Sequence, residues 1–472
     1  LPLLTAGCAV GPRYERPTVN ASAGFMTDAR IEARNASRPT PSLPNWWDRF
    51  DDPQLSRLVD EALSQNLDLN RALARVTQAR AALRSATAEL LPSAEVAGSA
   101  TRERTSVETP VGQVLSEQPG FNRTENVYEA DLVGSWEIDL FGGRRRGHES
   151  AQALYEAARA DVAAARLVVI AQTADTYVTI RGLQTRIAIA TAQIDKQRQL
   201  LELVSLQFSK GVSSALQVNQ ARGALSQAEA NLPELALELD AAMNALDVLL
   251  GVQPGAHRDE LSAPAPVPVA PTLATSGGPA SLIRRRPDLI VAERQLEASN
   301  ARIGEALSEY YPKFSLSGLL GSATIASGNL FTAGANQWQG AFGLRWRLFD
   351  FGRVDAEVKT ARGRNAEALA DYRLAVLHAT EDVENALSAL LNREQQERVL
   401  ANGESSLEQA RDASVAAYKG GAVSLIEVLD ADSRLLNTRD ARARAKIQAT
   451  RAAIASFRAL GGGWDVGAPE EG

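Results

Sequence analysis

Asp68-Leu69-Asn70-Arg71-Ala72 opens a stretch that returns, about 220 residues later, as Asp288-Leu289-Ile290-Val291-Ala292. Both stretches continue with the same spacing and end in proline: Ala86, Glu89 and Pro92 match Ala306, Glu309 and Pro312. Later motifs recur after about 210 residues, namely Gly143-Arg144 as Gly352-Arg353 and the turn at Gly211 as the turn at Gly421. The chain is therefore a duplication in which one loop is about ten residues shorter in the second copy.

The composition favours long helices. The chain has 472 residues, of which 45% are hydrophobic and only 5% aromatic, and Ala, Leu, Arg, Glu and Gln dominate it. No apolar run approaches the roughly 18 residues of a membrane-spanning helix. The net charge is −7 with acids and bases interleaved, which argues against nucleic acid as the main partner.

Cys8 is the only cysteine, so no disulfide can form within the chain. Residues 1–7 are apolar and end in the small pair Ala6-Gly7, which is typical of the last part of a bacterial lipoprotein signal peptide. We expect Cys8 to open the mature chain and to carry diacylglycerol and acyl chains, with no other cofactor and no metal. The alternative is an ordinary buried cysteine near a chain end.

Two segments alternate between apolar and polar side chains, the pattern of a half-exposed β-strand. In residues 128–140 the apolar side chains stand mostly at the even-numbered positions, and the charged side chains stand at the odd-numbered positions. The second copy alternates over residues 313–348, and residues 93–104 do so more weakly. These patterns predict two β-hairpins, residues 93–140 and 313–349, with the longer loop in the first.

Each hairpin is followed by a segment with almost no helix breakers, which predicts long helices over residues 144–208 and 353–418. About 65 residues of helix extend for roughly 100 Å. After each glycine-containing turn we expect a returning helix, residues 215–250 and 425–460, with Pro233 kinking the first. Shorter helices precede the hairpins: residues 55–91, broken near Asn66, and residues 288–311.

The remaining segments frame two repeats, residues 55–253 and 281–462. Residues 8–54 are rich in Pro, Ser and Arg and are predicted to be an extended arm that Trp46-Trp47 and Phe50 attach to the body. The Pro- and Ala-rich residues 254–280 are predicted to cross the surface as a connector, and residues 463–472 to form a tail.

The predicted strands have the length and alternation of membrane-spanning barrel strands. Tryptophans 136, 338 and 346 would then face lipid, and the charged side chains of the opposite parity would face a wet lumen: Glu129, Asp131, Glu137, Asp139, Arg345 and Arg347. Four strands cannot close a barrel, and a bilayer tolerates no open sheet edge, so the chain must oligomerise. Three copies would supply twelve strands. The alternative is a soluble hairpin pair on a helical rod.

Several motifs together resemble the lipoprotein outer-membrane factors of the TolC superfamily, in its NodT-like branch. They are residues 7–17 (Gly-Cys-Ala-Val-Gly-Pro-Arg-Tyr-Glu-Arg-Pro), 46–53, 285–289, 311–313, 348–353 and 459–464. The resemblance covers nearly the whole chain. It implies a mostly α homotrimer whose twelve-stranded transmembrane β-barrel continues as a long periplasmic α-helical barrel, lipid-anchored in the outer membrane. It also implies a passive efflux duct that a periplasmic adaptor connects to an inner-membrane pump of the resistance-nodulation-division type.

The resemblance also assigns a gate and a docking site. Residues 425–431 are similar to the family's constriction motif, which places an apolar ring at Ile426 and a carboxylate ring at Asp430. An ordinary solvated helix charge is the alternative for Asp430. Near the turns, the adaptor-contacting residues would be Gly211, Val212, Ser213, Gly421, Val423 and Ser424. Ordinary helix-ending glycines are the alternative for the two turns.

Other functions find less support in the sequence. The three histidines are far apart without metal-ligand spacing, and no glycine-rich phosphate loop follows a strand, so we expect no enzyme. The same fold could serve an ABC-type (type I) protein secretion system, and a periplasmic coiled-coil or adaptor protein is a further alternative. An adaptor would carry a single helical hairpin rather than two. The exported substrate is not encoded in any recognisable motif.

Overall fold

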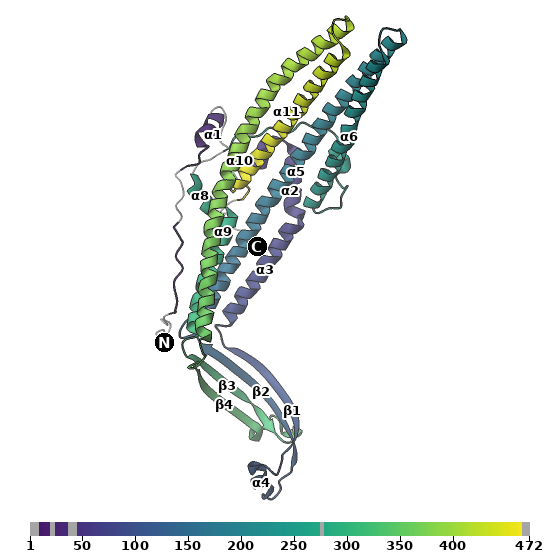
Figure 1. Ribbon diagram of the computed structural model, residues 1–472. Coiled ribbons are helices and arrows are strands. Elements are labelled where there is room, and N and C mark those ends of the chain that lie inside the picture. Colours follow the sequence, from purple (N-terminus) through teal and green to yellow (C-terminus); the bar gives the residue numbers. More distant parts are fainter. Residues whose placement is uncertain (1–8, 19–23, 36–44, 274–277, 465–472) are drawn as a thin grey trace. The chain divides into compact units, whose positions relative to one another are not determined.

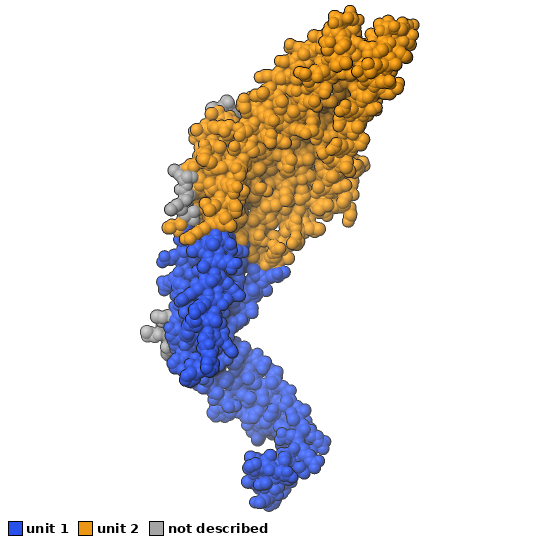
Figure 2. Space-filling view, viewed as in Figure 1, with its two compact units in different colours: residues 1–17, 77–157, 292–371 blue, residues 18–76, 158–291, 372–472 orange. Residues whose placement is uncertain are grey.

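A computed structural model describes residues 9–18, 24–35, 45–273 and 278–464 of the chain (Figure 1). Cys8 and residues 1–7 lie outside these ranges, so the predicted lipidation site is not described. The chain divides into two compact units (Figure 2). Unit 1 comprises residues 1–17, 77–157 and 292–371, and unit 2 comprises residues 18–76, 158–291 and 372–472.

Unit 1 contains one antiparallel four-stranded sheet with the strands in sequence order (Figure 1). Its members are β1 (Ser93–Arg104), β2 (Thr124–Ile138), β3 (Lys313–Thr324) and β4 (Asn336–Arg345). The predicted hairpins are β1–β2 and β3–β4, and β2 pairs with β3 to join them. The β1–β2 loop holds the short helix α4 (Pro110–Ser116), whereas the β3–β4 loop holds only the 3-10 turns η2 (Ser327–Asn329) and η3 (Ala333–Ala335).

The register gives the sheet two chemically different faces. Directly paired residues of antiparallel strands share a face, and Trp136 pairs with Leu316, Leu132 with Leu320, and Leu320 with Trp338. These side chains are exposed on the protomer. The opposite face carries all the acids of the strands together with Lys313 and Arg345, because each lies one position away from a residue of the apolar face. Arg102 and Arg104, at the far end of β1, share the parity of the apolar face. The alternation in the sequence therefore translates directly into one apolar and one polar face.

Long helices contribute to both units, each beginning near the sheet or ending at it. They are α3 (Leu67–Ala88), α5 (Gly143–Ser209), α9 (Pro287–Ser308) and α10 (Arg353–Lys419). Unit 2 adds α2 (Pro53–Gln65), α6 (Ala215–Leu249) and α11 (Leu425–Ala459). Asn66 separates α2 from α3, where its Oδ1 accepts hydrogen bonds from the backbone N–H groups of Asp68 and Leu69. Helix α6 runs through Pro233 without ending.

None of the helices in the described part of the chain combines the length and the apolar character needed to cross a membrane.

The N-terminal arm is less extended than predicted. It forms the helix α1 (Asp28–Asn35) and the 3-10 turn η1 (Trp46–Phe50) in unit 2. Arg34 on α1 forms an ion pair with Glu394 of α10 at 2.8 Å. Trp46 is fully buried and stacks on Phe457 of α11 with ring centroids 5.1 Å apart. The aromatic cluster therefore attaches the arm to unit 2, as the sequence predicted.

The Pro- and Ala-rich connector is partly buried, which corrects the prediction of a surface crossover. Its flanks form the short helices α7 (Arg258–Ser262) and α8 (Gly278–Arg285). Between them Val267 and Leu273 are buried, and the Thr450 hydroxyl of α11 donates a hydrogen bond to the Pro268 carbonyl at 2.9 Å. Proline-rich composition indicated an irregular path, but the apolar residues in that path pack against the helices.

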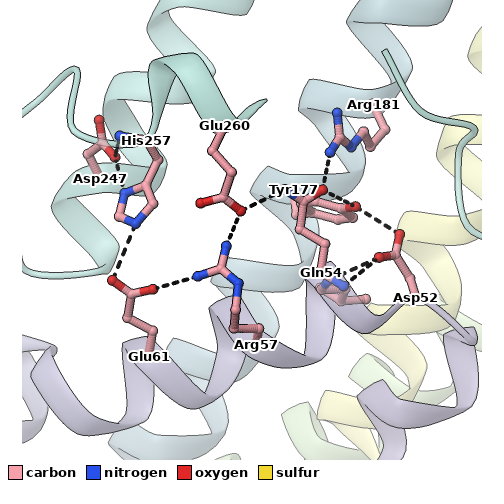
Figure 3. Close-up of polar contacts among 10 residues, drawn as sticks. Asp52, Gln54, Arg57, Glu61, Tyr177, Arg181, Asp247, His257 and Glu260 are labelled. Atoms are coloured by element: carbon pink, nitrogen blue, oxygen red, sulfur yellow. Dashed lines mark hydrogen bonds and ion pairs between the residues drawn. The ribbon is translucent and has the colours of Figure 1, made fainter. Parts of the chain in front are cut away.

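A polar network in unit 2 attaches this connector to α2, α5 and α6 (Figure 3). His257 lies between two carboxylates, with Nδ1 2.8 Å from Asp247 Oδ1 and Nε2 3.3 Å from Glu61 Oε1. Glu260 pairs with Arg57 of α2, and it accepts a hydrogen bond from Gln54 Nε2 at 2.8 Å. These contacts hold three segments that are distant in the sequence.

Beside this cluster Tyr177 of α5 is buried and donates a hydrogen bond to Asp52 Oδ2 at 2.8 Å (Figure 3). Asp52 Oδ1 also caps α2 by accepting from the backbone N–H groups of Gln54 and Leu55. Burial raises the pKa of Tyr177 to about 12, and the phenol therefore stays a donor at physiological pH. The network is an anchoring device, because its carboxylates are engaged with neighbouring donors.

Candidate gate at the helix tips

The turn between α5 and α6 is closed by its own backbone. Gly211 has a φ of +75°, and the N–H of Val212 bonds to the Gln207 carbonyl at 2.9 Å. This is the pattern of a helix that ends through a left-handed glycine. Ser214 then begins α6 with a capping box in which Gln217 bonds back to the Ser214 N–H at 3.0 Å. The sequence therefore specifies a tight turn without any tertiary partner.

The second turn, between α10 and α11, repeats this geometry. Gly421 has a φ of +74°, and the N–H of Ala422 bonds to the Ala417 carbonyl at 2.9 Å. Glu427 accepts hydrogen bonds from both the backbone N–H and the hydroxyl of Ser424. The acid in the first turn of α11 also suits the positive end of the helix dipole.

A shared apolar core lies just below both turns. It consists of residues from α5, α6, α10 and α11: Leu200, Val204, Val218, Ala221, Tyr418, Leu425 and Val428. Within it the Tyr418 hydroxyl donates a hydrogen bond to Gln207 Oε1 at 2.8 Å, linking α10 to α5. The two helical hairpins are therefore packed together in unit 2, with the turns left exposed above the core.

The two predicted constriction residues are both exposed on α11. Ile426 is 60% exposed although it is a large apolar side chain. Asp430 is also exposed, and its Oδ2 lies 2.8 Å from the Arg434 guanidinium one helical turn away. Buried Leu425 and Val428 occupy the other face of the same helix. Ile426 and Asp430 are thus free to contact another molecule or a lumen.

Asp432, two residues after Asp430 on the same helix, is withdrawn from water. It is only 5% exposed, and Gln197 Nε2 on α5 lies 3.4 Å from its Oδ2. Burial raises the pKa of Asp432, and the positive charges of Arg411 and Arg439 oppose this shift. Sequence reasoning missed this residue, because only the packing of α5 and α10 against α11 removes it from water.

The predicted lumen residues of the sheet fall into two groups. Glu129, Asp131, Glu137 and Arg345 lie within the strands on the polar face. Asp131 accepts a hydrogen bond from Gln337 Nε2 at 2.8 Å, and Glu129 accepts one from the Ser99 hydroxyl at 3.2 Å. Polar cross-strand contacts thus run across this face.

Asp139 and Arg347 lie just beyond the strand ends and have structural partners there. Asp139 accepts hydrogen bonds from the backbone N–H groups of Arg144 and Arg145, so it caps α5 rather than lining a strand. Arg347 forms an ion pair with Glu309 at 3.0 Å. The alternation that predicted lumen positions does not apply to these two residues, because both lie past the ends of their strands.

The sheet has one largely apolar and one polar face, and the helices end in short exposed turns. This is the architecture of a channel-forming membrane protein. The chain belongs to the family of outer membrane efflux proteins, whose model matches residues 58–252 and 279–462. It is 31% identical to Nodulation protein T of Rhizobium leguminosarum bv. trifolii, across 94% of this chain and 92% of that protein. It is also 29% identical to the probable outer membrane lipoprotein SilC of Salmonella typhimurium, across 98% and 97%.

Solved structures agree with this assignment. The outer-membrane channel OprN superposes with a TM-score of 0.86 at 34% identity, and the match covers 97% of this chain and 100% of that one. The resemblance to the TolC superfamily is thus confirmed, and so is the predicted mostly helical fold with a small antiparallel sheet. The protein is an outer-membrane efflux channel that conducts passively, and it is not an enzyme.

Proposed function

We propose that three copies of this chain form the exit duct of a tripartite pump that expels small molecules through the outer membrane. The four-stranded sheet carries this proposal, because its apolar face suits lipid and its two outer strands need neighbours in a bilayer. Three sheets supply twelve strands, enough for a water-filled barrel. The helical hairpins of the three copies would continue the duct into the periplasm.

The duct is closed at rest by side chains of α11. Ile426 and Asp430 are exposed on the helix face opposite the tip core, and three copies around an axis form an apolar ring and a carboxylate ring. Carboxylates that converge repel one another and attract cations, so the ring favours cations over anions. Arg434 pairs with Asp430 within one chain, which leaves the ring without that arginine as a link between subunits.

A periplasmic adaptor opens the duct by packing on the helix tips. A methyl group added at Gly211 or Gly421 would meet no described atom within 4 Å, and the residues that follow each glycine, 212–213 and 422–424, have small side chains. These surfaces, residues 211–213 and 421–424, admit close approach by another helix tip. The inner-membrane partner is a pump of the resistance-nodulation-division type, which selects the substrate among drugs, toxic compounds or metals.

The chain is additionally anchored by lipid on Cys8. The apolar residues before Cys8 support this modification, and so does the description of one relative as a probable outer membrane lipoprotein. The intact mass of the mature protein tests it. A mass that fits an unmodified Cys8 at the mature N-terminus contradicts the anchor.

The decisive experiment combines native mass and conductance. We expect the detergent-solubilised protein to have the mass of three chains and to conduct ions weakly in planar bilayers. A monomer without conductance contradicts the duct. Expression beside an adaptor and pump in cells that lack their own channel separates the alternatives. Lower accumulation of a small dye supports the pump-linked duct, whereas secretion of a polypeptide through an ABC exporter supports the other.

A further inference from the structure

Each protomer contains one junction between its two hairpins and leaves two sheet edges unpaired. Within the described residues, β1 and β4 each have a strand neighbour on one side only. An open edge carries unpaired N–H and C=O groups, which a bilayer does not tolerate. In the proposed trimer, β4 of one copy must therefore meet β1 of the next. This inference rests on that trimer and addresses how the two strands align.

The two hairpins are structurally equivalent, and their equivalent residues can be identified from contacts. Trp136 Nε1 donates to the Leu90 carbonyl at 3.1 Å, and Trp346 Nε1 donates to the Tyr310 carbonyl at 3.0 Å. The first hairpin starts with Ser93 opposite Ser135, and the second with Lys313 opposite Arg345. Both observations give the same correspondence: β2 matches β4 with Trp136 at Trp346, and β1 matches β3 with Ser93 at Lys313.

The internal junction supplies the template for the junction between subunits. In it, Trp136 lies opposite Leu316, and Glu137 lies opposite Ser315. In the junction between subunits, β4 takes the place of β2, and β1 of the next copy takes the place of β3. Each residue of the internal junction is then replaced by its equivalent. We propose that the subunits join with Trp346 opposite Val96 and with Arg347 opposite Glu95 of the neighbouring chain. A ring of such head-to-tail contacts closes after three copies.

The chemistry of the opposed residues agrees with this register. Val96 and Trp346 are both exposed and apolar, and the proposed register places them opposite each other on the apolar face, as Trp136 and Leu316 are inside the chain. Glu95 is exposed, and no described residue of its own chain forms an ion pair with it. Arg347 is partly exposed beside Glu309 and Glu357. In the proposed register Glu95 faces Arg347, which lies two residues beyond the end of β4, and would join the two acids that already pair with it. Inside the chain the equivalent residue, Glu137, faces Ser315.

Other registers are excluded by different arguments. A shift of one residue places Trp346 opposite Glu95 and reverses the faces of the sheet. A shift of two residues keeps the faces but breaks the equivalence of the two junctions, and it places Arg345 opposite Glu95. The proposed register and the register shifted by two residues both keep the apolar side chains on one face. The equivalence of the two hairpins favours the proposed register.

Cysteine pairs measure the register directly. The proposed alignment places Ala341 opposite Thr101 of the next chain, as Asp131 lies opposite Gly321 within the chain. Opposed Cβ atoms lie about 4.5–5.5 Å apart, whereas positions two residues away lie about 7–8 Å apart. Ala341→Cys with Thr101→Cys should give a covalent trimer on mild oxidation, and Ala341→Cys with Ser99→Cys should not. The single variants control for the natural Cys8.

The outcomes separate the register from the trimer. A native mass of three chains combined with cross-linking of the Ser99 variant overturns the register alone, and so does an intact trimer in which neither pair cross-links. A native mass of one chain overturns the trimer itself.

Charge reversal gives an independent measurement. We expect Glu95→Lys to lower the temperature at which the trimer dissociates on a semi-native gel, and Arg347→Glu in the same chain to restore it in part. Glu103→Lys is the matched control, because this acid lies on the same strand and face and would meet the neutral Gln339. Equal losses from both lysine variants contradict the ion pair.

Discussion

The Tyr418 hydroxyl lies 2.8 Å from Gln207 Oε1 and ties α10 to α5 directly below the exposed turns. The tyrosine ring is buried in the tip core, so the hydroxyl is the only part of this side chain that makes a directional link. Separation of the two helical hairpins requires this hydrogen bond to break. Its position makes it one of the contacts that resist opening of the proposed duct.

Removal of this hydroxyl should loosen the tips. Tyr418→Phe keeps the ring packing and deletes one hydrogen bond, worth about 0.5–1.5 kcal/mol. We expect a higher single-channel conductance in planar bilayers, with the trimer intact. Gln207→Ala should act similarly, and the double variant should add little to either single change. Fully additive effects would show that the two side chains act independently.

Neutralisation of the carboxylate ring should change ion flow. Asp430→Ala removes three converging charges from the proposed constriction, so conductance should rise and preference for cations should fall. Current–voltage curves in salt gradients measure both effects. Asp195→Asn removes an equally exposed acid on α5 as the control. Unchanged conductance and unchanged ion dependence in Asp430→Ala contradict the gate assignment.

Asp432 should make stability depend on pH. Its pKa is raised by burial, so the folded protein binds this proton more tightly than the unfolded chain does. The protonated Asp432 therefore adds to the free energy of unfolding. This contribution is complete at a pH below the pKa of an ordinary aspartate, and it is lost as the pH rises through the raised pKa of Asp432. Asp432→Asn should therefore raise the midpoint of thermal unfolding at neutral pH, with a difference that shrinks toward acid pH. A pH-independent difference contradicts this interpretation.

The turns should require glycine at positions 211 and 421 because of the left-handed backbone conformation there, and not because a larger side chain would collide with its neighbours. Gly211→Ala forces a side chain into the left-handed region at a cost of roughly 1–2 kcal/mol, and Gly421→Ala should do the same. Hydrogen exchange at the adjoining helix ends should accelerate. Gly223→Ala is the matched control inside α6, where the change should stabilise by about 0.5–1 kcal/mol. Equal exchange in all three variants contradicts the prediction.

Local patterns predicted the elements well, because their causes lie within a few residues. The alternation in residues 128–140 produced β2 with its two faces, and the glycine at position 211 ended α5 in a left-handed turn. Asn66 broke the helical pattern and then capped the next helix with its own side chain. Each of these outcomes depends on backbone geometry and on side chains that are neighbours along the chain.

One error arose where long-range packing decided the outcome. The connector looked like a surface segment by composition, yet Val267 and Leu273 are buried among helices. The error at Asp139 had a local cause: it followed the parity of the lumen residues, but α5 begins shortly after it and uses its carboxylate as a cap. The burial of the connector could not come from the local pattern, because distant helices determine it.

The sequence by itself determined the duplication, the alternating strands, the long helices and the tight turns of this outer-membrane efflux channel. The tertiary structure alone decided which polar groups leave water and which remain accessible. Asp430 and Asp432 are two residues apart on α11, and the burial of one and the exposure of the other follow from the helices that cover only one face. Burial is a property of the packed assembly, so no local pattern encodes it.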